Sequence, residues 1–307
     1  MWLKFRPMNI NYNLSDSDPW AETRPSKVYQ DEAEILPHKP KRRRGRLLLL
    51  VVLILAVYLF FPSKHTLLIL GIDRAFEGTA IGRSDTNLLV SVRPLPGSVS
   101  ILSIPRDLWV TIPGYGENRI NTAHFFGENQ QAGQGPDWAI NTVETNFETP
   151  VDSYLRIQLE NFPALVDAMG GINLDLETDM AGYSAGTHHL DGDQALAFVR
   201  DRAGTDDFFR MAQTQVFLKS FLKAILDPTT WPQLPAILQS MGQTIDTSIP
   251  VWQFPRIGIA VLRAYLTDNI NFLLITREDV APWVTNEGSQ VLLPNWPSIK
   301  AKIKDQF

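Results

Sequence analysis

The sequence predicts a layered fold of mixed helices and strands, α/β or α+β, which follows a single apolar helix near the amino terminus. Three observations support this prediction. Short apolar runs with the length of buried strands alternate with helical segments from residue 66 to about residue 226. One uninterrupted apolar run, Leu47 to Phe61, stands apart behind a basic cluster. The 307 residues, 44% of them hydrophobic, supply ample material for a buried core.

Composition narrows the possible chemistry. The absence of cysteine excludes disulfides, Cys-ligated zinc, iron–sulfur clusters and a thiol nucleophile. Residues 1–46 carry 10 Lys and Arg against 6 Asp and Glu, whereas residues 47–307 carry 18 against 27. An acidic body is a poor general surface for nucleic acid, so we expect no nucleic-acid partner. Any anion site within residues 47–307 must therefore be formed by a local cluster of basic residues.

The amino-terminal quarter predicts a membrane topology. Residues 1–46 read as a disordered, basic cytoplasmic tail and residues 47–62 as a transmembrane helix. The apolar run is only about 22 Å long, but Arg46 and Lys64 can extend it by snorkelling. A cleaved signal peptide is the rival interpretation, although the run lacks a small-residue cleavage site. The expected protein therefore crosses the cell membrane once, with residues 65–307 forming an extracytoplasmic domain.

Three short apolar runs are predicted to be buried strands: residues 66–72, 87–92 and 99–104. Asp73 follows the first, Asp85 precedes the second and Arg106 follows the third. If the strands pair antiparallel, as short connections favour, these side chains share one edge of one sheet. Oxygen ligands from Asp73 and Asp85 would then suit Mg²⁺, with Mn²⁺ and Ca²⁺ as alternatives. The competing interpretation is that each residue is a turn residue or forms a surface ion pair.

The rest of the body is expected to alternate helix and strand. The predicted strands are residues 109–112, 153–158 and 172–176, and the predicted helices are residues 137–147, 162–169, 194–199 and about 206–226. Gly114 to His124 reads as a glycine-rich turn that enters a helix, where free backbone N–H groups can bind an anion; a simple helix start is the alternative. His124 is interpreted as a core or supporting residue rather than a ligand.

Arginines indicate where an anion would bind. Arginine forks bind phosphate through two hydrogen bonds and stay charged when partly buried. Clustering of such residues in an acidic body predicts a specific polyphosphate pocket. Walker, G-x-S-x-G, H-E-x-x-H and Rossmann motifs are all absent, which leaves no visible basis for a nucleotide-driven enzyme, an acyl hydrolase or a zinc peptidase. Seven arginines lie at element ends or in loops beside Asp or Gly: Arg74, Arg83, Arg106, Arg119, Arg200, Arg202 and Arg210.

Five motifs follow one another in a recognisable order and spacing. They are Leu70–Arg74, Gly82–Thr86, Ser103–Asp107, Asn118–His124 and Leu190–Arg202. Together, behind a single apolar run, they resemble the LytR–CpsA–Psr family. The resemblance covers about residues 65–226 and continues more weakly to Val291–Asn295.

The resemblance implies a bacterial extracytoplasmic domain with a central mixed β-sheet sandwiched between helical layers, enclosing an apolar tunnel. It implies a phosphotransferase that moves a glycopolymer from a polyprenyl-pyrophosphate carrier to a peptidoglycan hydroxyl of the cell wall, forming a phosphodiester. By this resemblance Asp73 and Asp85 help to bind Mg²⁺, and all seven arginines contact the pyrophosphate. The expected catalytic residues are Asp73, Arg106, Asp107, Arg200 and Arg202.

One stretch departs from the family pattern. Where the family shows R-Q-Q after the D-F-x-R stretch, this chain has Gln213-Thr214-Gln215. That replacement leaves a less basic site and keeps a second hypothesis open, in which the domain binds the lipid carrier without chemistry. A lipid-diphosphate phosphatase, with water as acceptor, is the third. A membrane-bound transcriptional regulator is disfavoured because the tail has no helix-turn-helix pattern.

Overall fold

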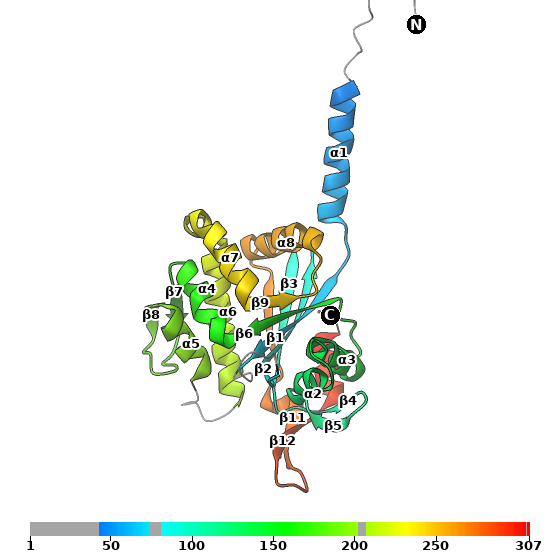
Figure 1. The fold of residues 1–307 in the computed structure, drawn as a ribbon, viewed down its shortest axis with the longest axis vertical. Helices are drawn as coiled ribbons and strands as arrows, with labels where there is room; N and C mark the ends of the chain where they lie inside the picture. Colours follow the sequence, from blue (N-terminus) through cyan, green and yellow to red (C-terminus); the bar gives the residue numbers. More distant parts are fainter. Residues whose placement is uncertain (1–42, 74–80, 202–206, 305) are drawn as a thin grey trace, which may run out of the picture. The chain divides into compact units, whose positions relative to one another are not determined.

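The structure is a computed structural model that describes residues 43–73, 81–201, 207–304 and 306–307. The chain divides into two compact units, residues 1–54 and 55–307. Helix α1 (Arg43–Phe60) begins in the first unit and ends in the second. The second unit, hereafter the body, holds all the strands of the described residues (Figure 1).

The membrane span predicted over residues 47–62 is not confirmed. Within the described ranges, none of the helices combines the length and the apolar character needed to cross a membrane. The apolar part of α1, Leu47 to Phe60, is about 21 Å long at 1.5 Å per residue, shorter than a hydrocarbon layer of roughly 30 Å.

A six-stranded mixed sheet forms the centre of the body, with the strand order β10-β3-β2-β1-β6-β9. The first three strands pair antiparallel, as predicted, because short connections join them. β6 adds parallel to β1 and β10 parallel to β3, while β9 closes one edge antiparallel to β6. The strands are β1 (His65–Ile72), β2 (Ser84–Arg93), β3 (Ser98–Ile104), β6 (Ser153–Gln158), β9 (Ile245–Thr247) and β10 (Ile270–Leu274).

Alternating side chains of the sheet enter two different cores. In β1, Leu68 and Leu70 pack on one face with residues of three helices, α2 (Thr122–Gln130), α3 (Gly135–Phe147) and α9 (Trp296–Ile303). Leu67 and Ile69 pack on the other face with α6 (Asp207–Leu226) and α8 (Phe254–Leu266). Figure 1 shows the sheet between these helical layers, which confirms the predicted mixed α/β architecture.

The remaining elements are short helices and two-stranded ribbons. The ribbons pair β4 (Trp109–Ile112) with β5 (Gly116–Arg119), β7 (Ile172–Leu176) with β8 (Gly186–Leu190), and β11 (Val280–Val284) with β12 (Gln290–Pro294). The other helices are α4 (Phe162–Ala168), α5 (Gly192–Arg200) and α7 (Leu234–Thr244), with 3₁₀ turns η2 (Leu159–Asn161), η3 (Pro228–Gln233), η4 (Val251–Gln253) and η5 (Arg277–Asp279).

The segment from Gly114 to His124 differs from its prediction. Strand β5 separates the glycine turn from helix α2, which begins only at Thr122. The cause is pairing with β4, since Trp109 lies opposite Arg119 in a hairpin whose turn contains Gly114. Gly114 has a φ of +83°, a left-handed conformation that suits glycine. The glycine turn therefore connects the two strands of a hairpin. It does not form a helix start whose backbone N–H groups could bind an anion.

Candidate functional site

The first three strands bring two predicted acids and one arginine to the same edge of the sheet. Asp73 follows the last residue of β1, and Asp85 is the second residue of β2, next to a bulge in the β1–β2 pairing. Arg106 lies two residues beyond the end of β3. The antiparallel register thus places these ends together, as the sequence predicted.

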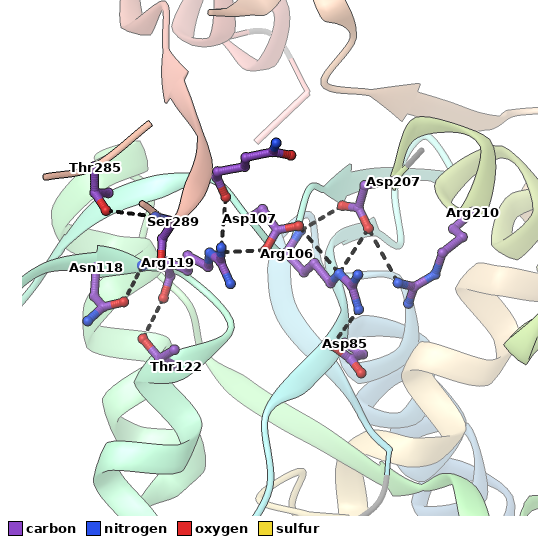
Figure 2. A network of polar contacts seen from close by, with 11 residues as sticks. Asp85, Arg106, Asp107, Asn118, Arg119, Thr122, Asp207, Arg210, Thr285 and Ser289 are labelled. Atoms are coloured by element: carbon purple, nitrogen blue, oxygen red, sulfur yellow. Dashed lines mark hydrogen bonds and ion pairs between the residues drawn. The ribbon is translucent and has the colours of Figure 1, made fainter. Parts of the chain in front are cut away.

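Arg106 is the centre of the polar network in Figure 2. Its Nη1 donates to Asp85 Oδ1 at 3.1 Å. Its Nε lies 3.2 Å from Asp207 Oδ1 and 3.5 Å from Asp107 Oδ2. Burial on its own lowers the pKa of Arg106, but the carboxylates of Asp85, Asp207 and Asp107 outweigh it and hold that pKa above its ordinary value. Arg106 is therefore a permanent cation facing three acids.

Asp207, the first residue of α6, is a site residue that the sequence analysis missed. Its Oδ2 accepts a hydrogen bond from the backbone N–H of Arg106 at 3.1 Å, and its Oδ1 lies 3.6 Å from Nη1 of Arg210. Burial raises the pKa of the Asp207 carboxyl, a shift that Arg106 and Arg210 offset only in part. An acid at the start of a helix is common for reasons of the helix dipole alone, so its sequence position carried no functional signal.

Arg119 joins the same network from the end of β5. Its Nε lies 3.3 Å from Asp107 Oδ1, and its Nη2 donates to the carbonyl of Gln290 at 2.8 Å (Figure 2). Asp107 therefore lies between Arg106 and Arg119 and contacts both. The strand pairing of β5 places Arg119 here, because Arg119 is the last residue of that strand.

Asp73 and Arg200 form a second pair, with Arg200 Nη2 2.5 Å from Asp73 Oδ1. Arg200 is the last residue of α5, a helix that begins with a capping box between Asp191 and Gln194. The carbonyl of Phe198, in the same last turn, accepts a hydrogen bond from the fully buried side chain of Gln213 on α6. Gln213, one of the departures from the family pattern, thus joins the helix of Arg200 to the helix of Arg210.

Three predicted arginines remain. Arg74 and Arg202 lie outside the described residues. Arg83 is exposed and forms no ion pair with any residue that the structure describes. Its neighbour Ser84 is held by a 3.1 Å hydrogen bond from its backbone N–H to the carbonyl of Asn121.

His124 supports this loop from inside the body, as the sequence analysis expected. It is fully buried, and its Nδ1 lies 2.9 Å from the carbonyl of Gly82. Its Nε2 lies 3.3 Å from Nη1 of Arg156, which also pairs with Glu128. Burial lowers the pKa of His124, so the neutral ring donates through Nδ1 and accepts through Nε2. His124 therefore positions the segment before Arg83 and Asp85.

A polar pocket and an apolar cavity share part of their lining. Asp85, Arg106, Asp207 and Arg210 line the polar pocket. The cavity, about 250 Å³ in volume, lies between the sheet and α6 and is walled by apolar side chains such as Ile69, Leu155, Phe217 and Phe221. The residues common to both are Thr86, Leu88 and Thr214.

Gly71, on β1, leaves space where the polar pocket and the apolar cavity meet, hereafter the junction. Gly71 lies opposite Thr86 in the β1–β2 register, and a Cβ at Gly71 would come within 2.9 Å of Thr86 Cβ. Thr214 approaches from α6, with its hydroxyl donating to the carbonyl of Arg210 at 2.9 Å. The arrangement suits an amphiphile with an anionic head at the arginines and an apolar chain in the cavity.

The acids can be tested for their fit to a metal ion. Within the described ranges no group of three or more acidic or histidine side chains could hold one. Mg²⁺ does not require such a cage, because it usually takes one or two carboxylates and completes its shell with phosphate oxygens and water. Asp73 and Asp85, at adjacent strand ends, supply such a pair. The donor set therefore fits Mg²⁺ together with a phosphate ligand.

A mixed sheet between helical layers, with an arginine-rich pocket beside an apolar cavity, defines an α/β protein suited to an amphiphilic anion. A sequence model of the LytR_cpsA_psr family matches residues 62–304. The chain therefore belongs to this family, as its motifs indicated.

Relatives in this family have been named for their activity. A protein from Oceanobacillus iheyensis, named polyisoprenyl-teichoic acid–peptidoglycan teichoic acid transferase TagU, is 33% identical over 189 residues, 60% of this chain and 58% of that protein. TagT of Bacillus subtilis, named for the same transfer, is 30% identical over 62% of each chain. TagU of Halalkalibacterium halodurans is 31% identical over 71% of this chain and 76% of its own. The chain thus spans about 60% of the length of the first two relatives.

Solved structures share the fold. Bacillus subtilis TagV superposes with a TM-score of 0.64 at 23% identity, over 80% of this chain and 97% of TagV. TagT bound to LIIa-WTA superposes with a TM-score of 0.65 at 24% identity, over 79% of this chain and 89% of TagT.

Proposed function

We propose that this protein is a phosphotransferase that moves a glycopolymer from a polyprenyl-diphosphate carrier to a hydroxyl of cell-wall peptidoglycan. The observation that supports it is the shared lining of the polar pocket and the apolar cavity at Thr86, Leu88 and Thr214. A diphosphate attached to an isoprenoid needs an anion site and a hydrocarbon site side by side. The names of the relatives support the glycopolymer and the acceptor.

The arginines of the pocket are suited to bind a diphosphate, which can replace the carboxylates that pair with them. Arg106 and Arg210 now pair with Asp207, and Arg106 also pairs with Asp85. A diphosphate brings more negative charge and more acceptor oxygens than one carboxylate, so it can replace these contacts with bidentate ones. The carboxylates then hold the arginines in place between turnovers.

The proposed reaction forms one bond and breaks one. The acceptor hydroxyl oxygen attacks the phosphorus that bears the glycopolymer, and the bond from this phosphorus to the bridging oxygen breaks. Lipid phosphate leaves, and the product is a phosphodiester. Placement and charge stabilisation dominate such a reaction. Arg106, Arg119 and Arg200 stabilise the added negative charge, and Asp107 and Asp201 are the candidates that accept the hydroxyl proton.

Mg²⁺ is part of the proposal. Asp73 and Asp85 would hold it, and when bound it would neutralise charge on the diphosphate oxygens. Location at the cell membrane also belongs to the proposal, because the carrier is a membrane lipid. The single-pass topology with an extracytoplasmic body stays a prediction from the basic cluster and the apolar run.

The test is a transfer assay with purified protein, lipid-linked glycopolymer, peptidoglycan acceptor and Mg²⁺. Arg106→Ala should reduce transfer by at least about a hundredfold, the scale lost with a group that stabilises transition-state charge. Lys223→Ala is the matched control, because Lys223 forms an exposed ion pair with Asp175 at 2.9 Å on another surface. Undiminished transfer by folded Arg106→Ala protein would contradict the proposed site.

A carrier-binding module without chemistry is the second candidate. It is favoured by the Gln213–Thr214 stretch, where Gln213 is fully buried and bonded to Phe198, and the Thr214 hydroxyl is bonded to Arg210. Neither side chain adds a cation to the pocket. The same assay separates the candidates, since a binder yields no product and a phosphatase yields free lipid phosphate without polymer on the acceptor.

A further inference from the structure

The segment from Pro228 to Leu266 has an unusual composition for the surface of a soluble domain. It contains only three charged residues in 39, namely Asp246, Arg256 and Arg263. It comprises η3, α7, β9, η4 and α8. Figure 1 shows α7 and α8 at the same end of the body, opposite the β4–β5 hairpin.

Large apolar side chains of this segment are exposed to solvent. Val251 is 81% exposed, Trp252 67% and Leu238 64%. A surface helix usually combines an apolar inner face with a polar outer face. In α7, however, Ile237 is buried while its neighbour Leu238 is exposed, so a large apolar side chain of this helix also faces solvent. We call the exposed group the apolar end surface; its members are Trp231, Leu238, Val251, Trp252, Phe254 and Leu266.

The apolar end surface is continuous with the cavity. Met241 of α7 and Ile245 of β9 line the cavity, and Leu238 lies one turn before Met241 on the same helix. A hydrocarbon chain that moves along α7 therefore meets apolar side chains from the exterior to the cavity wall.

The surface is also joined to another exposed apolar segment. Arg256, in the first turn of α8, donates to the carbonyl of Phe61 at 2.8 Å, and Phe61 is 56% exposed. The guanidinium of Arg263 lies 5.3 Å from the centre of the Phe60 ring. Phe60, the last residue of α1, and Phe61, which follows it, thus extend the same apolar region.

Charge at the surface suits an anionic lipid. The one acid of the segment, Asp246, is paired with Arg156, whose Nη2 lies 2.7 Å from its Oδ2 and whose Nη1 pairs with Glu128. The remaining charges are the two arginines of α8. Exposed Trp and aliphatic residues together with basic residues are typical of helices that lie in a membrane interface.

We propose that the apolar end surface docks the body on the lipid bilayer, with its apolar side chains in the boundary between headgroups and acyl chains. The isoprenoid chain then passes from the bilayer along α7 into the cavity. This path rests on the proposed function, whereas the docking itself is measured without turnover.

The test uses the natural absence of cysteine. Leu238→Cys and Trp252→Cys in the full chain are each labelled with an environment-sensitive fluorophore. The protein is then reconstituted with vesicles of phosphatidylcholine and phosphatidylglycerol that carry brominated acyl chains. Tyr115→Cys is the matched control, because Tyr115 is an exposed aromatic residue of the β4–β5 turn at the other end of the body. We expect several-fold stronger quenching at positions 238 and 252 than at position 115.

Equal quenching at the three positions overturns docking. A fluorescence change that depends on protein concentration and not on lipid also overturns it, because it assigns the surface to a second copy of the chain. Quenching at 238 and 252 in a protein that yields no transfer product keeps the docking surface and rejects only the proposed function. Folding of each variant is checked by thermal unfolding before labelling.

A second measurement addresses the lipid path. In Leu238→Glu/Trp252→Glu protein, transfer from carrier embedded in vesicles should fall several-fold, while transfer from carrier dissolved in detergent should stay unchanged. Both substitutions are at exposed positions outside the pocket and the cavity lining. Equal transfer from vesicles by wild type and variant overturns the path along α7.

Discussion

Asp207 contacts Arg106 twice, although 101 residues separate them in the chain: its carboxylate accepts from the backbone N–H at 3.1 Å and lies 3.2 Å from the side-chain Nε. These contacts join the start of α6 to the end of β3. They also place two groups with raised pKa values in contact. Burial raises the pKa of Asp207, and the neighbouring carboxylates raise the pKa of Arg106. We therefore expect the anion affinity of the pocket to depend on the protonation of Asp207.

Protonation of Asp207 should strengthen anion binding. Because burial raises its pKa above the ordinary 3.8, the Asp207 carboxyl takes up its proton at a higher pH than an exposed aspartate does. Loss of this negative charge removes one of the acids that compete with a diphosphate for Arg106 and Arg210. Affinity for inorganic pyrophosphate, measured by calorimetry, should rise as the pH falls toward this pKa.

Asp207→Asn provides the comparison for that titration. The variant should bind pyrophosphate more tightly than wild type at neutral pH, and the difference should shrink as the pH falls. Pyrophosphate also titrates, but it does so equally in both experiments, so only the difference is interpreted. Parallel pH profiles for the two proteins would show that Asp207 does not control the pocket.

Gly71→Val should narrow the junction between pocket and cavity. A Cβ at Gly71 already comes within 2.9 Å of Thr86 Cβ, so a branched side chain pushes Thr86 toward the shared lining. Binding of a long polyprenyl phosphate should weaken by at least tenfold, about 1.4 kcal/mol. Binding of inorganic pyrophosphate should change little. A variant that loses both ligands equally would contradict a junction at this position.

Asp279→Asn should destabilise the fold in a pH-dependent way. Burial raises the pKa of Asp279, but hydrogen bonds from Lys302, Thr276 and Ser298 outweigh it and lower the pKa to about 2 from 3.8. A lowered acid pKa stabilises the folded state above the unfolded value of 3.8, and this stability is lost as the pH falls to about 2. The shift corresponds to about 2 kcal/mol at neutral pH.

Urea unfolding provides the measurement for this prediction. The free energy of unfolding of Asp279→Asn should be about 2 kcal/mol below wild type at neutral pH, and the gap should close toward pH 2. Lys302→Met, which removes the cation bonded to Asp279, should show a loss of similar size. A gap that is constant with pH would indicate packing rather than charge as its cause.

Mg²⁺ should strengthen pyrophosphate binding through the two acids at the strand ends. Asp85→Asn keeps the shape of the side chain but removes the charge that suits a hard cation. In calorimetry with pyrophosphate, addition of Mg²⁺ should raise the affinity of wild type and have a much smaller effect on Asp85→Asn. If Mg²⁺ strengthens binding equally in both proteins, Asp85 is not a ligand.

Local patterns in the sequence determined the strands and the edge at which their charged ends meet. Apolar runs bounded by turn residues predicted β1, β2 and β3, and the connections between them favour antiparallel pairing. Asp85 and Arg106 were therefore expected together, and their hydrogen bond is 3.1 Å long. The prediction of a turn entering a helix at Gly114 was wrong, because pairing of β5 with β4 is a contact between strands that a local pattern does not contain.

Only the tertiary structure decided what completes the site. Asp207 reaches Arg106 because α6 packs across the end of β3, and Gln213 is a buried link to α5 rather than a pocket residue. The cavity arises where β1, β2, β6, α4, α6 and α7 fail to fill the space between them. A sequence determines periodicity and local charge, which depend on neighbours along the chain. The polar pocket, the apolar cavity and the raised pKa of Asp207 depend on which segments, distant in the sequence, pack together and exclude water. Such packing is a property of the tertiary structure.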